Sequence, residues 1–320
     1  MLGALAGGRS RGLATFAGGA GLLVVGQGGA VYSLTAAAYW TPAAPAAIAT
    51  GLSLGAGALV AAWRVRAERA ALMALFSRHL APAVAERIWQ QRAAFLDGGV
   101  PRPQVLTATV LFADIRGFTG IVERYDQSVV IAWLNAYLDA AAQAVAAEGG
   151  IVDKFVGDAV MAVFGAPVPR TADAEVQADA QAAARAALQI RARLDTLNRD
   201  WTARGWPTAA VRIGLHTGTV TAGSLGRGDR LEYTVIGDTV NVAARLEQAA
   251  TRALPEDGSA GACAIALSAA TRAHLGTAFE TRSLGSVALK GKRQPTPAYA
   301  LDGPAGAAGS AQRTRVGAVA

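Results

Sequence analysis

The chain has 320 residues, enough for about two domains, and a formal net charge of +7. Hydrophobic residues make up 52% and charged residues only 17%, an unusual balance for a soluble protein that one uncharged segment largely explains. The positive charge is scattered, and no basic run is interleaved with aromatic residues, so we expect no nucleic-acid partner. The one cysteine, Cys263, cannot form an internal disulfide, which indicates a reducing compartment for the main domain.

The N-terminal segment, residues 1–63, is predicted to be a membrane hairpin. It has no Asp, Glu, Lys, Arg or His from Gly12 to Trp63, and it is longer than the roughly 20 residues that one span needs. Two prolines break it in the middle, so we expect transmembrane helices over about 13–39 and 46–63. Arginines flank both ends, and the positive-inside rule therefore places both ends and the following domain in the cytoplasm. The alternatives are a cleaved signal peptide, whose apolar region would be shorter, and a disordered Gly/Ala-rich leader.

Residues 64–104 are predicted to form a helical juxtamembrane stalk and linker. The segment is Ala-rich and charged, and its apolar residues recur at an approximately helical spacing as far as residue 96. A plain amphipathic linker fits this pattern equally well. The Gly- and Pro-rich residues 98–103 mark the boundary of the next domain.

From residue 105 to residue 301 the pattern alternates between strands and helices. The expected elements are a strand at 106–115, a helix at 122–148, a hairpin at 151–164, a helix at 174–204, strands at 210–215, 219–222 and 231–236, a helix at 239–250, and strands at 264–268 and 286–289. The opening β-α-β-β-α-β order predicts an α+β fold with a ferredoxin-like sheet whose helices cover one face. The tail, residues 302–320, is Gly/Ala-rich and predicted to be disordered.

Two aspartates lie at corresponding ends of strand-like runs in this domain. Asp114 ends the first strand, and Asp158 follows the turn of the predicted hairpin. A Gly-Phe-Thr turn at residues 117–119 comes directly after the first of them, and its backbone amides could face an anion. Singly, each aspartate fits a solvated turn residue; together, beside this turn, they are what two divalent cations holding a nucleoside triphosphate require.

A second pair of residues, Asn241 and Arg245, is four positions apart on the predicted helix 239–250, so the two share one face. A guanidinium fixed on such a face can meet developing negative charge. The alternative is an exposed helix face that carries an ordinary Arg–Glu pair.

Five motifs together resemble the class III nucleotidyl cyclases, the family that makes cyclic AMP or cyclic GMP. They occur in the family's order over about 200 residues, and a single one would be weak. The motifs are Leu-Phe-Ala-Asp-Ile-Arg-Gly-Phe-Thr at 111–119, Asp-Lys-Phe-Val-Gly-Asp-Ala at 153–159, Gly-Leu-His-Thr-Gly at 214–218, Glu-Tyr-Thr-Val-Ile-Gly-Asp-Thr-Val-Asn-Val-Ala-Ala-Arg at 232–245 and Leu-Lys-Gly-Lys at 289–292.

The resemblance implies a metal site and a phosphate-binding turn. Asp114 and Asp158, with the backbone carbonyl of Ile115, would bind two divalent cations, Mg²⁺ or Mn²⁺. One cation would activate the ribose 3′-hydroxyl and the other would steady the polyphosphate. The amides that would cradle phosphate oxygens are those of Gly117, Phe118 and Thr119.

The resemblance also assigns the nucleotide contacts. Asn241 would orient the ribose, and Arg245 would meet the charge that grows on the α-phosphate. Lys154 and Thr234 match the purine-selecting positions: the ammonium can donate to N1 of adenine, and the hydroxyl can pair with the exocyclic amine. Guanine would present N1–H to the lysine, so ATP is favoured over GTP.

Lys290 matches the lysine that reaches the terminal phosphates, with Lys292 ranked second; a solvated basic turn is the alternative for both. His216 is interpreted as structural, and the resemblance names no protein general base. Thr219 departs from the pattern, because some animal cyclases place a phosphate-contacting arginine there.

The family builds its site across a dimer interface, which implies a homodimer with two equivalent sites. The two aspartates would come from one subunit and the purine-selecting and transition-state residues from the other. The resulting expectation is a bacterial adenylate cyclase of the inner membrane with a cytoplasmic catalytic domain. The rival interpretations are a guanylate cyclase, a catalytically inactive nucleotide-binding receptor and a membrane scaffold.

Overall fold

The computed structural model describes Tyr32, Ala36 and residues 43–76, 96–97, 100–226, 232–253, 263–287 and 295–306. The chain divides into two compact units, residues 1–71 and 72–320, and each is described by itself. Most of the predicted first membrane helix, the stalk beyond residue 76, Lys290, Lys292 and the tail beyond residue 306 lie outside the described residues.

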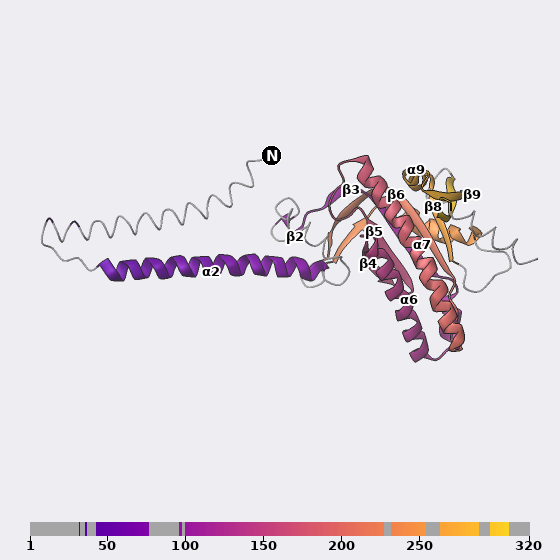
Figure 1. Cartoon of the computed structure of the whole chain (residues 1–320), viewed down its shortest axis with the longest axis horizontal. Helices are drawn as coiled ribbons and strands as arrows, with labels where there is room; N and C mark the ends of the chain where they lie inside the picture. The colour runs from indigo at the N-terminus through magenta and orange to yellow at the C-terminus, as the bar shows by residue number, and fades with distance from the viewer. Residues whose placement is uncertain are drawn as a thin grey trace, which may run out of the picture. The chain divides into compact units, whose positions relative to one another are not determined.

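In the N-terminal unit the described structure is dominated by one long helix, α2 (Ala43–Phe76), which Figure 1 shows as a continuous coil. It contains the whole of the predicted second membrane helix and continues into the predicted stalk without a break at Trp63. Its apolar side chains are spread around the helix rather than along one stripe. Leu52, Leu59 and Trp63 are each at least 70% exposed. Residues 43–63 of this helix are uncharged, whereas Arg64, Arg66, Glu68 and Arg69 follow them in the same helix.

Among the described helices, α6 (Gln127–Ala147) is long and apolar enough to cross a membrane. Its Trp133, Tyr137 and Ala141 side chains, however, are buried in the core of the second unit. We therefore interpret α6 as a core helix of that domain, which length and composition alone cannot distinguish from a membrane span.

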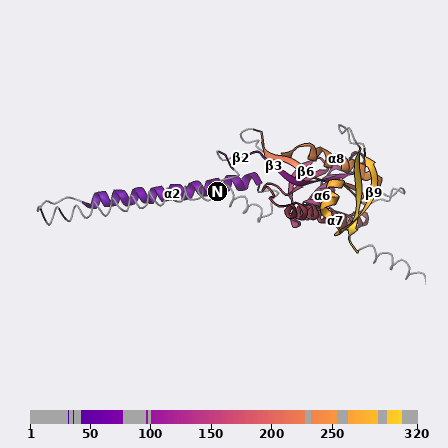
Figure 2. The ribbon, with the colours of Figure 1, turned by 90° about the horizontal axis from the view of Figure 1, so that it is seen from above.

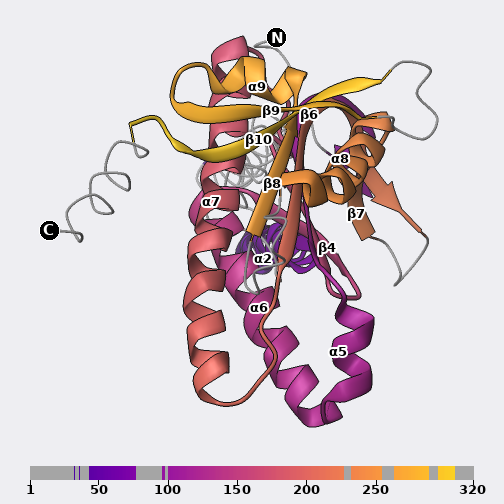
Figure 3. The ribbon, with the colours of Figure 1, turned by 90° about the vertical axis from the view of Figure 1, so that its right-hand side faces the viewer.

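The second unit is built on an eight-stranded sheet, shown edge-on in Figure 3. The strand order is β4-β5-β3-β6-β8-β10-β9, and β7 pairs with β6 off this path. The strands are β3 (Gln104–Ile115), β4 (Ile151–Val156), β5 (Ala159–Phe164), β6 (Val211–Leu225), β7 (Glu232–Ile236), β8 (Cys263–Ser268), β9 (Phe279–Val287) and β10 (Thr296–Pro304). A separate pair of two-residue strands, β1 (Leu96–Asp97) and β2 (Val100–Pro101), precedes the sheet.

The helices of this unit are α5 (Phe118–Arg124), α6, α7 (Asp173–Ala203), α8 (Asp238–Ala249) and α9 (Ala269–Leu275), with a short 3₁₀ turn at Ala250–Ala253. The first six elements of the sheet and its long helices follow the predicted β-α-β-β-α-β order. β3 lies between β5 and β6 and is antiparallel to both, so two β-α-β units interleave. The α+β class and the ferredoxin-like arrangement are thus observed.

Three details differ from the sequence prediction. The helix expected over 122–148 is two helices, α5 and α6, because Asp126 caps a new helix by accepting a hydrogen bond from the Ser128 amide at 2.8 Å. The two strands expected over 210–222 are one 15-residue strand, β6. The C-terminal part has more structure than predicted, because α9 and β10 lacked a recognisable pattern and β9 begins earlier than expected.

The two long helices of the β-α-β-β-α-β order, α6 and α7, cover one face of the sheet, as predicted, and the later helix α8 covers the other. α6 and α7 pack on one face, where alternate residues of β3 such as Leu111 and Ala113 join Trp133 in the largest core cluster. α8 packs on the opposite face, where Val110 and Ala243 belong to a second cluster. Figure 2 shows the strands between α6 and α7 on one side and α8 on the other. The two faces of β3 are both buried, so its period-two pattern could not reveal which face a helix covers.

Gly214 on β6 is required for the close approach of α8. A Cβ atom there would overlap the backbone of Ala243 and Glu247. The glycine at the start of the Gly-Leu-His-Thr-Gly motif therefore sets how α8, and the residues that it carries, sit on the sheet.

Candidate functional site

Asp114 and Asp158 are brought together at one end of the central strands. Asp114 is the penultimate residue of β3, and Asp158 lies in the tight turn between β4 and β5, next to Gly157 with its left-handed backbone. The two carboxyl groups are near enough for the charge of one to act on the other. Burial and then the negative charge of Asp114 raise the pKa of Asp158 to about 6.

Arg212 on β6 is the positive charge that the structure supplies to this pair. Asp114 and Arg212 are directly opposite in the β3–β6 register. The Arg212 Nη2 donates to Asp114 Oδ2 at 2.6 Å, and its Nε lies 2.8 Å from Glu247 Oε1 on α8. The second contact is an ion pair whose angle does not make a hydrogen bond. Burial outweighs the attraction of Arg212, so the pKa of Glu247 is raised to about 7.

The turn after Asp114 is held in place by aromatic packing. Gly117 has a left-handed backbone (φ 72°) and precedes α5, whose first turn has neither a side-chain cap nor an acidic residue. The ring of Phe118 stacks on Trp133 with centroids 6.3 Å apart, and Trp133 donates from Nε1 to the Pro207 carbonyl. Gly117 and Thr119 are exposed, and the first N–H groups of α5 have no partner within the helix.

Lys154 and Thr234, far apart in the sequence, meet around Asp153. The Thr234 hydroxyl donates to Asp153 Oδ2 at 2.7 Å. The Lys154 ammonium lies 3.5 Å from the same oxygen and 3.0 Å from Glu232 Oε1. Burial raises the pKa of Asp153, whereas the hydrogen bond from Thr234 and the charge of Lys154 oppose the rise. The pKa of Lys154 is raised, because its contacts with Glu232 and Asp153 outweigh its partial burial.

Asn241 and Arg245 lie one turn apart on α8, as the four-residue spacing predicted. Asn241 is exposed and Arg245 is partly exposed. In the part of the chain that the structure describes, neither side chain has a hydrogen bond or ion pair. The pair is therefore available to a ligand.

Within one chain the candidate residues fall into two groups. The metal end comprises Asp114, Asp158 and the turn that follows β3. The base end comprises Lys154 and Thr234, on β4 and β7. Among the described residues, no hydrogen bond or ion pair joins either aspartate to the base end or to Asn241 and Arg245.

Three residues that take part in these groups escaped the sequence analysis: Arg212, Glu247 and Asp153. Arg212 reaches Asp114 only through the β3–β6 register, and no sequence period reveals that pairing. Glu247 lies two residues after Arg245, so its place on α8 was readable but its partner across β6 was not. Asp153 precedes Lys154 within a quoted motif, and a buried acid beside a selected lysine is a signal that could have been used.

The contact of His216 fits a structural role. Its Nδ1 lies 2.8 Å from Ser268 Oγ on the neighbouring strand, away from the aspartate pair. Among the described residues, no three His, Cys, Asp or Glu side chains gather as a metal cluster. A metal ion at this site would rely on two carboxylates, a backbone carbonyl and its ligand's own oxygens.

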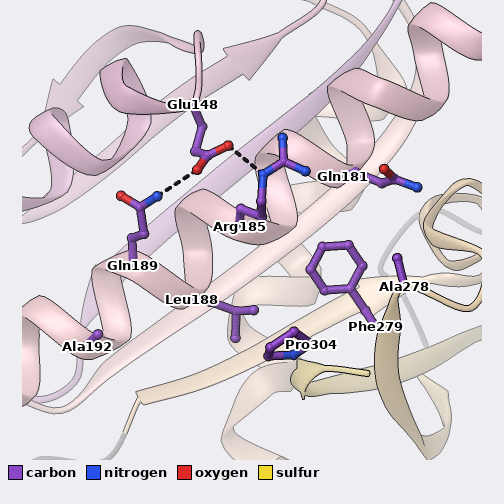
Figure 4. Close-up of a pocket in the computed structure, with 9 residues that line it drawn as sticks. All are labelled: Glu148, Gln181, Arg185, Leu188, Gln189, Ala192, Ala278, Phe279 and Pro304. Atoms are coloured by element: carbon purple, nitrogen blue, oxygen red, sulfur yellow. Dashed lines mark hydrogen bonds and ion pairs between the residues drawn. The ribbon is translucent and has the colours of Figure 1, made fainter. Parts of the chain in front are cut away.

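A cavity of about 510 Å³ lies elsewhere on the domain, between α7 and the ends of β9 and β10. Figure 4 shows Phe279, Leu188 and Pro304 along its apolar side and the Glu148 carboxylate bonded to Arg185 and Gln189 on the other. None of the predicted site residues lines it. Its polar side chains already have hydrogen-bond partners, because Arg185 and Gln189 bond to Glu148 and Gln181 bonds to the Leu275 carbonyl.

Comparison with known proteins agrees with this geometry. The model of the adenylate and guanylate cyclase catalytic domain matches residues 100–303. Adenylate cyclase 1 of Rhizobium meliloti (strain 1021) is 44% identical over 139 residues, which are 43% of this chain and 20% of that protein. The matched segment therefore spans about a fifth of the length of that relative.

Solved structures show the same fold. The adenylyl cyclase CyaB from P. aeruginosa is 34% identical with a TM-score of 0.56, and the match covers 63% of this chain and 96% of that one. The guanylate cyclase domain of RhGC from Catenaria anguillulae, solved in complex with GTP, is 30% identical with a TM-score of 0.52, covering 63% and 99%. The chain belongs to the family of adenylate and guanylate cyclase catalytic domains, the class III nucleotidyl cyclases.

Proposed function

We propose that this chain is an adenylate cyclase, which converts ATP to 3′,5′-cyclic AMP and pyrophosphate. The observation that carries the proposal is the meeting of Lys154 and Thr234 on separate strands around Asp153. A lysine can only donate, which suits N1 of adenine, and a threonine hydroxyl can accept from the exocyclic amine. Guanine has a donor at N1 and an acceptor oxygen at position 6, the reverse of adenine at both places. The names of the Rhizobium relative and of CyaB point the same way.

The metal end fits divalent cations by its charge and its donor atoms. Arg212 pairs with Asp114 and with Glu247 of α8, and Asp158 adds a further carboxylate near Asp114, so negative charge is in excess. Carboxylate and carbonyl oxygens are the ligands that Mg²⁺ and Mn²⁺ prefer. Asp114, Asp158 and the carbonyl of Ile115 would hold two such ions. When bound, these ions would lower the pKa of the ribose 3′-hydroxyl and neutralise the polyphosphate.

In the proposed reaction the 3′-oxygen of the ribose forms a bond to the α-phosphorus, and the bond from that phosphorus to the β-phosphate oxygen breaks. The hydroxyl proton leaves to solvent or to a phosphate oxygen, and pyrophosphate departs. Asn241 orients the ribose, and Arg245 meets the negative charge that develops on the α-phosphate. The amides of Gly117, Phe118 and Thr119 hold phosphate oxygens. Lys290, outside the described residues, is proposed to reach the terminal phosphates.

We propose further that the site forms between two copies of the chain. Its support is that, among the described residues, no hydrogen bond or ion pair joins Asp114 or Asp158 to Asn241 or Arg245, although Arg212 links Asp114 to Glu247 of the same helix. A C2 dimer would place the metal end of each subunit against the base end of its partner and so generate two equivalent sites.

Attachment to the bacterial inner membrane remains a proposal. Its support is the exposed apolar surface of α2, an uncharged sequence as far as Trp63, and arginines on both sides of that segment. The second span of the proposed hairpin would be the N-terminal half of α2, and its C-terminal half would lie in the cytoplasm.

The test is analysis of the products that the full chain, purified in detergent, makes from ATP and from GTP with Mg²⁺ or Mn²⁺. Cyclic AMP from ATP, and far less cyclic GMP from GTP, is the expected result. Cyclic GMP as the main product would make the chain a guanylate cyclase and contradict the base assignment. No cyclic product, with tight nucleotide binding, would indicate a receptor domain.

A further inference from the structure

We propose that Asp153 is a specificity-determining residue, which orients the Thr234 hydroxyl so that its lone pairs, and not its proton, face the purine. The inference rests on the proposed adenine site at Lys154 and Thr234 and deepens it. Asp153 itself would not contact the base; it would act through its neighbour.

The contact that supports the inference is buried and short. The Thr234 hydroxyl donates to Asp153 Oδ2 at 2.7 Å, the Asp153 side chain is 5% exposed, and Thr234 is 4% exposed. Water therefore has little access to compete for the hydroxyl proton. The contact joins two strands, β4 and β7, that are not paired with each other in the sheet.

A carboxylate fixes the direction of this hydrogen bond. An ionised carboxylate only accepts, whereas a hydroxyl has one proton and two lone pairs. With its proton committed to Asp153, Thr234 can offer only lone pairs to a ligand. The ammonium of Lys154, 3.5 Å from the same carboxylate oxygen, favours the ionised form of Asp153.

The consequence is a difference between purines at position 6. Adenine carries an amine there, which can donate to the Thr234 lone pairs. Guanine carries a carbonyl oxygen, which would face lone pairs and leave both acceptors unsatisfied in a buried site. Without Asp153 the hydroxyl could turn and donate to that carbonyl, so threonine alone would not discriminate between the two bases.

Lys154 also forms an ion pair with Glu232, so the surroundings of the lysine can be changed without removing Asp153. Glu232 Oε1 lies 3.0 Å from the ammonium, and in the part of the chain that the structure describes no hydrogen bond joins Glu232 to Thr234. Glu232 therefore offers a matched control: its removal changes the surroundings of Lys154 while the Asp153–Thr234 contact remains.

The experiment compares kcat/KM of the full chain for ATP, GTP and purine riboside triphosphate, which lacks the exocyclic amine. In Asp153→Ala the preference for ATP over GTP should fall by about tenfold, and the penalty for losing the amine should shrink by several-fold. Asp153→Asn keeps an acceptor oxygen and should retain most of the preference. If Asp153→Ala does not fold, Asp153→Val removes the acceptor while filling the space.

Two further variants distinguish this role from a structural one. Glu232→Ala should leave the penalty for the missing amine unchanged. In Thr234→Val, which lacks the hydroxyl, adding Asp153→Ala should change the ATP/GTP ratio no further, because the two residues act as one unit. A merely structural Asp153 would lower kcat/KM for all three nucleotides equally, and that result would overturn the inference.

The same nucleotides tested by competition against a fluorescent ATP analogue separate this inference from the proposed function. Cyclic AMP production with an unchanged ATP/GTP ratio in Asp153→Ala overturns the inference alone. A chain that makes no cyclic product but whose ATP/GTP binding ratio falls in Asp153→Ala overturns the proposed function and supports the inference. Equal binding of ATP and GTP by the unsubstituted chain contradicts both.

Discussion

The two ends of the candidate site differ in how their charges are balanced. At the base end the Thr234 hydroxyl and the Lys154 ammonium each have an acidic partner within the same chain. At the metal end Arg212 pairs with Asp114 and with Glu247 of α8, and the pKa values of Asp158 and Glu247 are raised to about 6 and about 7. The base end is thus organised before any ligand arrives, whereas the metal end has an excess of negative charge that a bound cation would neutralise.

The largest expected effect is on turnover and belongs to the metal end. Asp114→Asn removes one of the two carboxylates that would hold the cations, and cyclase activity should fall on the order of 10³-fold or more. Nucleotide preference in the residual activity should be unchanged, because the base end is intact. Asp139→Asn, an exposed carboxylate on α6, is the matched control and should keep full activity. Activity within tenfold of the unsubstituted chain in Asp114→Asn would contradict the metal assignment.

The next effect is on stability and tests the excess of negative charge directly. Arg212→Met removes the guanidinium between Asp114 and Glu247, so two partly buried carboxylates lose their partner. The free energy of unfolding in EDTA should fall by about 2–4 kcal/mol. Removing Arg282, whose pairing with Asp302 is long and exposed, should cost less than about 1 kcal/mol. The free energy of unfolding is measured with a denaturant. Equal, small losses in both variants would show that Arg212 does not stabilise the Asp114 and Glu247 carboxylates.

The smallest effect is a pH dependence of stability. The pKa of Glu247 is raised from 4.5 to about 7 in the folded state, so the folded state binds more protons than the unfolded state between these values. This contribution is fully present below about pH 4.5 and is lost as the pH rises through about 7. The unsubstituted chain in EDTA should therefore lose about 1–3 kcal/mol of stability from pH 5 to pH 8.

Glu247→Gln should flatten this slope in part, with the remainder due to Asp158, whose pKa is raised in the same direction. The exposed Glu123→Gln should leave the slope as it was. The melting temperature, measured at several pH values for the three proteins, tests this prediction. An unchanged slope in Glu247→Gln would mean that the Arg212 charge offsets the burial of Glu247 and that its pKa is not raised.

The comparison also shows which parts of the site a sequence can predict. Asp114, Asp158, Lys154 and Thr234 lie within local motifs, and the structure places them in two compact groups. Their neighbours could not be found in this way, because Arg212 reaches Asp114 through a strand register and Asp153 reaches Thr234 across unpaired strands. Interactions between distant segments depend on the fold rather than on sequence spacing.

In the fold, too, local patterns were predictable and contacts between distant segments were not. Strands with clear alternation or continuous apolar runs, such as β3 and β5, were predicted to within a few residues. The break between α5 and α6 was missed because Asp126 looked like one more polar residue in a long helix. The position of α8 on the second face follows from Gly214, whose need for close backbone contact only the packed structure reveals.

Mixing two inactive variants tests the central claim, that each site joins the metal end of one subunit to the base end and α8 of another. Asp114→Asn disables the metal end and Arg245→Ala disables the transition-state contact on α8. Co-expressed in equal amounts, they would form mixed dimers in which one site carries both substitutions and the other carries neither. Cyclic AMP production should return to about a quarter of the unsubstituted level, since about half of the dimers would be mixed. If the mixed dimers form and stay as inactive as either variant alone, the site does not span two subunits and the account is wrong.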